Sequence, residues 1–461
     1  MADEADWAIN EFGSAELGDK RRTDRLIALA GVLARRPTAS LPEACEEPAM
    51  LKGAYRWLEN PAIDPQAVLA SHVQATLERA AVVPVVLAVQ DTTELDYSHH
   101  PATVGLGPIG NGYGRGLLVH STLAITPERL PLGLLAQQEW VRDPDDMGKK
   151  HRRKHLPIDQ KESRKWLDGL AALGALATAC PGTQFVSLAD READVYDLLC
   201  AERPANVALL VRAAYDRRVA DADALVGPVR AHLATQPAGH TLVVAVPRQG
   251  SRPARAARVQ VRWAAVTLRP PANRAKDHLP AVPLWVVWAH EASPPTGAAL
   301  DWLLLSTLPV ADAAAAERTL YWYACRWTIE VWHTILKSGC ALEARQLESL
   351  AALQRGLALF SVIAWRLLYA SLLARAVPDL PCTVLLETVE WQALYCAIHQ
   401  TPTPPRRPPT LHQAVRWIAQ LGGFLGRKSD GEPGATVLWR GLQRLADLTL
   451  MFQVFTPAAT G

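Results

Sequence analysis

The sequence predicts a mixed α/β protein with helical segments at both ends. Three observations support this class. Short apolar runs in the middle of the chain end at polar residues, as buried strands do. Residues 7–80 and the chain after residue 313 instead carry apolar residues at helical spacing. Between residues 213 and 295, short alternating runs and many prolines predict a β-rich insertion.

Length and composition exclude a disordered polyelectrolyte. The chain has 461 residues, 49% of them hydrophobic, and a formal net charge of +2. At roughly 150 residues per domain, this length suggests about three domains. A net charge near zero would argue against a nucleic-acid partner, but it is an average over the whole chain. Residues 212–276 alone contain twelve Lys+Arg against three Asp+Glu. Net charge therefore does not exclude DNA.

The N-terminus and the cysteines predict a cytoplasmic protein with no membrane partner. The first six residues are acidic where a signal peptide would be basic, and no apolar run reaches the ~18 residues of a membrane span. The seven cysteines are an odd number without a Cys-x-x-Cys pair. We therefore expect reduced thiols rather than disulfides or a zinc site.

The first half of the chain contains the predicted strands. Residues 7–80 are expected to be helical, and Val82–Val89 is expected to be a buried strand that ends at Asp91. A basic segment, Lys149–Lys154, precedes a predicted helix, and Asp190 follows a later strand. The further strands are predicted at 117–125, 130–138, 185–189 and 207–212, and the helices at 162–179 and 193–200.

The second half is predicted to be mostly helical. A strand at 302–305 is followed by a long helix over about 313–338 and another over about 347–374. A proline-rich linker, 401–410, then precedes a helical segment over 411–452.

One predicted helix carries a narrow polar stripe that consists of Tyr323, Arg326, Glu330 and Lys337. At ~100° per residue the four side chains fall within about 60° of arc. A solvated face with an ordinary Arg326–Glu330 ion pair is the alternative interpretation. The pattern favours a metal-binding glutamate beside groups that bind phosphate, since arginine grips phosphate in a fork and lysine offers a point charge.

Two further carboxylates follow predicted strands, at Asp91 and Asp190. Either aspartate alone could be a turn cap. In open α/β sheets, however, active sites gather at the carboxyl ends of strands. With Glu330 the two aspartates make three carboxylates, which would repel one another if brought together without a cation. Two Mg²⁺ or Mn²⁺ ions would resolve the conflict, and such ions activate water and stabilise both oxygens of a phosphoryl transfer.

In these residues the chain resembles the DDE transposases of the ribonuclease-H-like integrase superfamily, specifically the insertion sequence four family that includes the transposon-five type. That family's signature is Tyr, two residues, Arg, three residues, Glu, six residues and Lys, which the stripe satisfies. Gln90–Thr93 and Asp190–Asp194 resemble its acidic motifs. Gly18–Leu26 resembles its DNA-end-binding helix, and Leu421–Phe424 its dimerisation segment.

The resemblance implies a domain organisation. We expect a helical DNA-end-binding domain at 1–75, a ribonuclease-H-like catalytic core at 76–375 with its insertion at about 213–300, and a helical dimerisation domain at 376–461. The implied partners are the terminal inverted repeats of the element, the target DNA and a second copy of the chain. The implied location is the bacterial cytoplasm, at the nucleoid when DNA is bound.

The resemblance also implies the site residues. Asp91, Asp190 and Glu330 would bind two Mg²⁺ (or Mn²⁺) ions, and the other three residues of the stripe would hold phosphates. Trp302 matches the aromatic that receives a base flipped out during hairpin formation. The DNA-binding residues are expected to be Arg21, Arg22, Arg25, Arg212, Arg217, Trp302 and Trp327.

The implied reaction is cut-and-paste transposition, with metal-dependent cleavage of the ends, a hairpin intermediate and joining to target DNA. Two alternatives remain. The first is a stand-alone metal-dependent nuclease, against which the Arg21, Arg22 and Arg25 cluster argues. The second is a catalytically idle DNA-binding descendant of a transposase, which the intact acidic residues disfavour. The arginine cluster could also be a solvated face, and Trp302 and Trp327 could be core aromatics.

Overall fold

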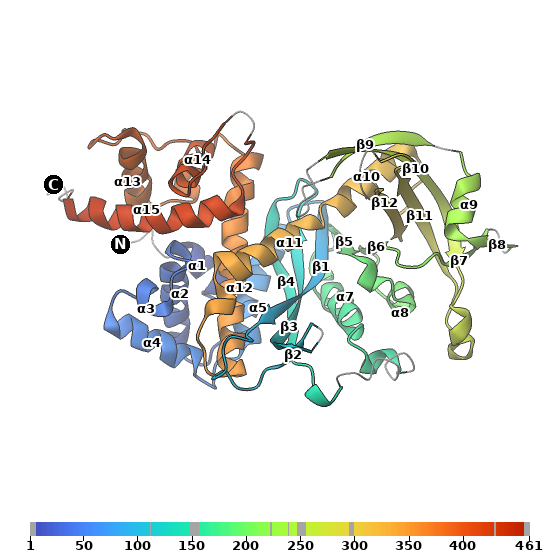
Figure 1. Cartoon of the computed structure of the whole chain (residues 1–461), viewed down its shortest axis with the longest axis horizontal. Coiled ribbons are helices and arrows are strands. Elements are labelled where there is room, and N and C mark those ends of the chain that lie inside the picture. Colours follow the sequence, from blue (N-terminus) through green and yellow to red (C-terminus); the bar gives the residue numbers. More distant parts are fainter. Residues whose placement is uncertain are drawn as a thin grey trace.

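A computed structural model describes residues 6–110, 112–146, 156–221, 224–237, 239–246, 255–294, 299–427 and 430–455. A twelve-stranded sheet occupies its middle, and helices from both ends of the chain lie together at one end of the molecule (Figure 1). The predicted mixed α/β class with helical ends is confirmed. The basic segment Lys149–Lys154 lies outside the described residues.

The N-terminal part is helical, as predicted. Two of its helices begin at aspartate caps: Asp19 accepts the backbone N–H of Arg21, and Asp64 accepts that of Gln66. The predicted domain limit at residue 75 falls inside the last of these helices. The helices are α1 (Asp6–Phe12), α2 (Lys20–Arg35), α3 (Leu41–Ala44), α4 (Pro48–Leu58) and α5 (Pro65–Ala80).

Five adjacent strands form the part of the sheet that carries the aspartates. Their spatial order is β4-β3-β1-β5-β6. The pairs β1–β5 and β5–β6 are parallel, whereas β1–β3 and β3–β4 are antiparallel. The four strands predicted after the first are confirmed. The strands of this region are β1 (Val85–Asp96), β2 (Gly107–Ile109), β3 (Gly114–Ile125), β4 (Pro131–Trp140), β5 (Gln184–Ala189) and β6 (Val207–Arg212).

The expectation that the first strand ends at Asp91 is wrong. The parallel pairing of β1 with β5 stops at Val89, but its antiparallel pairing with β3 continues to Asp96. Asp91 therefore stands inside β1, just beyond the point where one neighbouring strand ends. The extension depends on pairing with a strand more than twenty residues away, which the local apolar run does not reveal.

Two helical layers cover this sheet. On one face lie α7 (Arg164–Ala177) and α8 (Tyr196–Cys200). On the other lie α10 (Ala313–Ala324), α11 (Trp327–Thr334) and α12 (Leu350–Ala376) (Figure 1). The helix predicted over 193–200 is shorter than expected, because a 3₁₀ turn (Arg191–Ala193) and the extended residue Val195 precede α8.

The single long helix predicted over 313–338 is also wrong. The chain tightens after α10, where the N–H of Arg326 bonds to the carbonyl of Tyr323, three residues back. After α11, residues Ile335–Gly339 form a π-helical turn, closed by the N–H of Cys340 donating to the carbonyl of Ile335. The polar stripe is therefore not on one helix: Tyr323 lies in α10, Arg326 in the turn before α11, Glu330 in α11 and Lys337 in the π-helical turn.

The insertion is β-rich, as predicted, and extends the sheet away from the aspartates (Figure 1). The short helix α9 was not anticipated by the alternating pattern. The elements of this region are β7 (Arg218–Asp221), β8 (Ala224–Pro228), α9 (Val229–Thr235), β9 (His240–Val246), β10 (Arg255–Leu268), β11 (Val282–His290) and β12 (Asp301–Ser306), and β12 returns beside β6.

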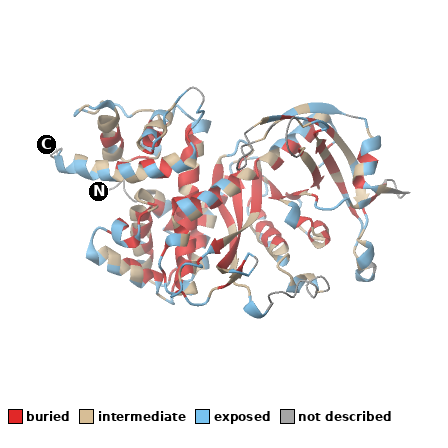
Figure 2. Cartoon of the chain, in the orientation of Figure 1, coloured by how far each residue is buried: buried red, intermediate tan, exposed pale blue. Residues whose placement is uncertain are grey.

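The C-terminal part contains α13 (Thr388–His399), α14 (Leu411–Leu421) and α15 (Ala435–Phe455). The helical segment predicted over 411–452 is thus two helices. They cross closely, because a Cβ at Gly422 would lie 1.8 Å from the carbonyl oxygen of Val437. Within the described residues, α12 is long and apolar enough to cross a membrane, but 83% of its most apolar stretch is buried in the protein (Figure 2).

All seven cysteines are free thiols, and five of them are buried.

Candidate active site

Strand register brings the predicted residues of β1, β5 and β6 into one row. Val89 pairs with Leu188, so Asp91 and Asp190 are the next positions along their strands that point to the same face. Ala189 pairs with Val211 in the same way, so Arg212 follows at the level of Asp190. The sequence predicted the ends of β5 and β6 but not this register.

The row faces the helical layer that carries Glu330. Leu87 and Val89 of β1 point to the core shared with α10–α12, as do Val186 and Leu188 of β5. Side chains alternate between the two faces of a strand, so Asp91 and Asp190 point the same way. By the same parity, Arg212 and Trp302 lie on this face, and all four residues are partly exposed.

Arg326 lies between two of the carboxylates. Its Nη2 donates to Oε1 of Glu330 at 2.6 Å, and its Nη1 lies 3.9 Å from Oδ2 of Asp91. The Arg326 side chain is only 11% exposed, and its buried Nε has no hydrogen-bond partner within the part of the chain that the structure describes. The buried guanidinium of Arg326 thus neutralises two carboxylates. It marks a position at which positive charge is electrostatically favoured.

The surroundings of Asp91 disfavour the ionised form of its carboxyl group. Its pKa is raised from 3.8 to about 6, chiefly by burial and also by the carboxylates of Asp190 and Glu330, while Arg326 and the N–H of Thr92 oppose the change. Asp190 is more accessible, and its Oδ1 accepts the N–H of Glu192 at 2.8 Å. The carboxylates of Asp190 and Glu330 therefore interact electrostatically with that of Asp91, as is expected of a shared site.

These residues fit a hard divalent cation by donor chemistry, because carboxylate oxygens are the ligands that Mg²⁺ and Mn²⁺ prefer. The raised pKa of Asp91 is the sign that a positive charge would stabilise the cluster. Across the described residues, no three acidic, histidine or cysteine side chains stand close enough to hold a metal as they are. Metal binding would require Arg326 to release Glu330.

Tyr323 and Trp302 form an aromatic wall beside the acids. Tyr323 is 3% exposed, and its ring packs edge to face against that of Trp302, with centroids 5.3 Å apart. Burial raises the pKa of the Tyr323 hydroxyl, whereas burial lowers the pKa of Arg212 beside it. Trp327 lies under the guanidinium of Arg326, 5.5 Å from ring centroid to Cζ.

Lys337 does not contact the acidic row. It pairs with Glu343 at 3.3 Å, and both side chains are partly exposed. The predicted single helix placed Lys337 in line with Glu330. The π-helical turn and the ion pair with Glu343 are features that the local sequence pattern does not contain.

Two buried histidines lie near Asp91, one on each face of the sheet: His333 on α11, and His120, whose ring packs against Trp166 of α7. Nδ1 of His333 lies 3.8 Å from Oδ2 of Asp91, and its buried Nε2 has no hydrogen-bond partner among the described residues. His120 hydrogen-bonds to Thr92 and Gln90. Burial lowers the pKa of each to about 3, so both imidazoles are neutral. His333 lies three residues after Glu330, and His120 lies on β3, which pairs with β1. Their spacing in the sequence therefore does not match a metal-binding motif.

The predicted end-binding arginines lie along α2. The Arg21 side chain is 89% exposed and pairs with Asp19 at 2.7 Å. Arg22 donates to the carbonyl of Leu17 at 2.7 Å, and Arg25 lies against Gly53 of α4. Arg21 is therefore the most available of the three for a phosphate.

Two family models match the chain, one at each end. The model described as Transposase DNA-binding matches residues 4–63, and the Transposase Tn5 dimerisation domain matches residues 362–452. These two matches support a transposon-five-type transposase of the insertion sequence four family. They indicate a DNA transposase with a DNA-binding region near its N-terminus and a dimerisation region near its C-terminus.

The matched regions correspond to the two helical ends of this transposase. Residues 4–63 contain α1–α4 and the arginines of α2, and residues 362–452 run from within α12 into α15. The resemblance read at Gly18–Leu26 and Leu421–Phe424 falls inside these matches. The acidic row and the stripe lie between them, in the part that neither model covers.

The Arg217 side chain is held by contacts within the transposase itself. Its guanidinium donates twice to Oδ1 of Asp194, at 2.6 and 2.9 Å, and once to the Asp194 carbonyl at 2.8 Å. Asp194 also accepts the N–H groups of Ala214 and Tyr215. These contacts fix the turn that follows β6, so a phosphate contact by Arg217 stays a prediction.

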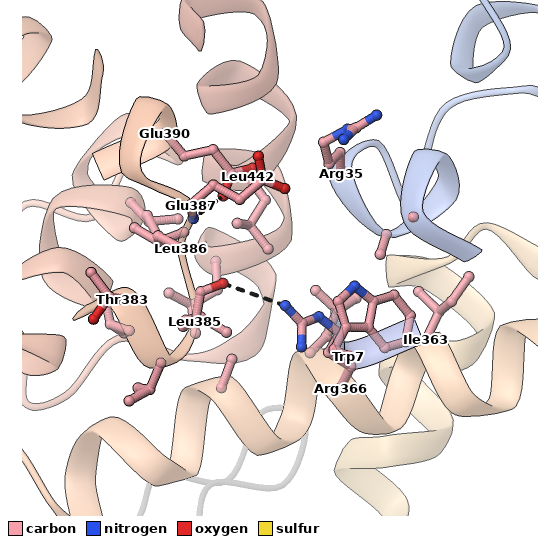
Figure 3. A pocket seen from close by; sticks show the side chains of 18 of the residues that line it. Trp7, Arg35, Ile363, Arg366, Thr383, Leu385, Leu386, Glu387, Glu390 and Leu442 are labelled. Carbon is pink, nitrogen blue, oxygen red and sulfur yellow. Dashed lines mark hydrogen bonds between the residues drawn. The ribbon is translucent and has the colours of Figure 1, made fainter. Parts of the chain in front are cut away.

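A cavity of about 330 Å³ lies where the two helical ends meet, between α1, α12 and α13 (Figure 3). Arg366 stacks on Trp7 at 4.4 Å and donates to the carbonyl of Leu385 at 3.4 Å. Burial lowers the pKa of Arg366 to about 10. Its described lining includes none of the predicted metal or phosphate ligands, so this cavity is separate from the candidate active site.

Proposed function

We propose that this transposase cleaves the ends of its element by metal-dependent phosphoryl transfer and joins them to target DNA. The observation that carries this proposal is the convergence of Asp91, Asp190 and Glu330 on one side of the sheet. The three acids come from β1, β5 and α11, which are far apart in the chain. A structural role would not require three acids to approach one another, two of them beside the same arginine.

The sheet order supports a ribonuclease-H-like core. An antiparallel β4-β3-β1 meander followed by two parallel strands, β5 and β6, is the topology that this superfamily is expected to have. In the proposal, the acids lie where β1 loses its parallel neighbour, and the helix with Glu330 closes the same site.

Asp91, Asp190 and Glu330 would hold two Mg²⁺ or Mn²⁺ ions. Bound there, the ions would lower the pKa of a coordinated water and stabilise negative charge on the phosphate. The chain's own groups supply the rest. Arg326 would exchange Glu330 for a DNA phosphate, and Tyr323 and Lys337 would position the phosphates that flank the cleaved bond.

Trp302 and the dimer extend the proposal to the later steps. Trp302, partly exposed beside Tyr323, would stack on a base extruded while the freed strand forms a hairpin. Synapsis of two ends within the dimer would precede strand transfer into target DNA. Both steps rest on the family membership together with the aromatic wall.

A stand-alone nuclease is the rival function. A nuclease has no need for an end-recognition region or a dimerisation region, whereas this chain has both. An idle DNA-binding descendant is the second rival, and it has no need for three intact acids in one cluster. Assays of strand cleavage and of joining distinguish both rival functions from the proposed one.

The test uses purified protein, Mg²⁺ and DNA that carries the element's terminal repeats. We expect Asp91→Asn, Asp190→Asn and Glu330→Gln each to abolish strand cleavage while binding of the ends is retained. Asp168→Asn is the matched control, since Asp168 lies on α7, on the opposite face of the sheet. Cleavage that persists in any of the three variants would refute the proposed site, and cleavage without joining would favour the nuclease.

A further inference from the structure

The chain turns back on itself directly after Lys337. Lys337 lies in the π-helical turn Ile335–Gly339, and Ala341 adopts a left-handed conformation with φ of 48°. Non-glycine residues rarely take this conformation, and both π turns and such residues concentrate at functional sites. The reversal brings the next polar residue, Glu343, back toward Lys337.

Glu343 joins Lys337 to the strand that carries Asp91. Its Oε1 accepts the backbone N–H of Asp96 at 2.9 Å and lies 3.3 Å from Nζ of Lys337. Asp96 is the last residue of β1, five residues beyond Asp91. One carboxylate oxygen therefore fixes the lysine ammonium to the end of the strand that carries Asp91.

The segment that presents Glu343 is itself firmly held. The buried Tyr97 hydroxyl donates to the carbonyl of Leu342 at 3.0 Å. On the other side of Glu343, the buried guanidinium of Arg345 donates to the carbonyls of Pro37, Ala39 and Cys340. Glu343 thus has a fixed backbone on both sides and does not follow the motion of the lysine side chain.

An ammonium group has three N–H donors, so pairing with Glu343 leaves donors for a DNA phosphate. A long lysine side chain otherwise samples many rotamers, and restricting it before DNA arrives lowers the cost of forming the reactive geometry. We propose that Glu343 is a positioning residue that aims Lys337 at the phosphate beside the cleaved bond. This inference rests on the proposed phosphate role of Lys337.

The test is a double-mutant cycle measured by single-turnover cleavage of pre-bound transposon ends. Glu343→Gln keeps an oxygen for the Asp96 N–H but loses the ion pair, and we expect about tenfold slower cleavage with unchanged end affinity. Lys337→Ala should be slow as well, and the double variant should cleave no more slowly than Lys337→Ala alone. A residue with a purely structural role would not show this coupling.

Glu348→Gln is the matched control, because the Glu348 side chain is exposed in the same segment, and its cleavage rate should be normal. Thermal unfolding of each variant shows whether the fold is intact. Normal or faster cleavage by Glu343→Gln, or a slowdown that persists in the Lys337→Ala background, would overturn the inference about Glu343. Normal cleavage by Lys337→Ala would instead overturn the phosphate role of Lys337, and the role of Glu343 with it.

Discussion

Arg326 and Glu330 form a 2.6 Å ion pair at the centre of the acidic cluster, one helical turn apart. The same guanidinium lies 3.9 Å from Asp91. Arg326 therefore occupies the position of a counter-ion for two proposed metal ligands. The arrangement predicts that the arginine and a divalent cation compete for these carboxylates in the free protein.

Replacing Arg326 should separate metal binding from cleavage. In Arg326→Ala the carboxylates lose their counter-ion, so we expect Mn²⁺ to bind the DNA-free protein several-fold more tightly by calorimetry. Cleavage should fall by about 100-fold, because a phosphate contact is lost. Arg318→Ala, an exposed arginine of α10, is the control and should change neither quantity. Weaker Mn²⁺ binding in Arg326→Ala would contradict the competition.

Asp91 should make the metal-free protein less stable at neutral pH. The folded state raises the pKa of Asp91 from 3.8 to about 6, so it keeps a proton that the unfolded chain loses in that window. Its contribution to the free energy of unfolding is full below about pH 4 and is lost as pH rises through about 6. Asp91→Asn avoids this loss and should stabilise the protein at pH 7.5 by at most about 3 kcal/mol.

Chemical denaturation in the presence of a chelator at pH 4.5 and 7.5 measures this difference. The gain of Asp91→Asn over the unmodified protein should be full at the higher pH and fall to about one third of that value at the lower one. A variant that is less stable at both values would show that Asp91 is stabilised by its neighbours and that the carboxyl is not under strain.

Trp302 should act in hairpin formation rather than in the first cut. Stacking of one base on an aromatic contributes about 1–3 kcal/mol. We therefore expect Trp302→Ala to slow hairpin formation roughly tenfold or more while the initial nick forms at its normal rate, as followed on denaturing gels. Trp302→Phe should retain most of the activity. Equal slowing of both steps would point to a packing defect against Tyr323 instead.

Arg21 should contribute to end binding by charge. Its side chain is 89% exposed, so Arg21→Ala should weaken binding, reduce the salt dependence by about one ion and leave the unfolding midpoint unchanged. Arg22→Ala should also lower the midpoint, because Arg22 holds the carbonyl of Leu17. Unaltered salt dependence in Arg21→Ala would remove Arg21 from the DNA-binding residues.

The sequence predicted most of the elements around the site for a physical reason. Buried strands such as 185–189 and 207–212 consist of continuous apolar runs, and such runs are local signals. The polar stripe is likewise local, since four residues within fifteen positions define it. Asp190 was placed correctly after its strand because the strand and the turn are contiguous.

Features that depend on distant partners were not predictable in this way. The extension of β1 past Asp91 requires pairing with β3, and the break near Arg326 requires helix packing against the sheet. The pairing of Lys337 with Glu343 requires the chain reversal at Ala341. In each case a contact between separate segments overrides the local pattern.

Iron-directed cleavage of the polypeptide tests the central claim most directly. Fe²⁺ replaces Mg²⁺, and ascorbate with peroxide generates radicals that cut the backbone beside the bound ion. We predict cuts close to Asp91, Asp190 and Glu330 together, suppressed by excess Mg²⁺ and lost in Asp190→Asn. Cuts that leave out one of the three segments, or that persist unchanged in Asp190→Asn, would contradict a single metal site built from these three carboxylates.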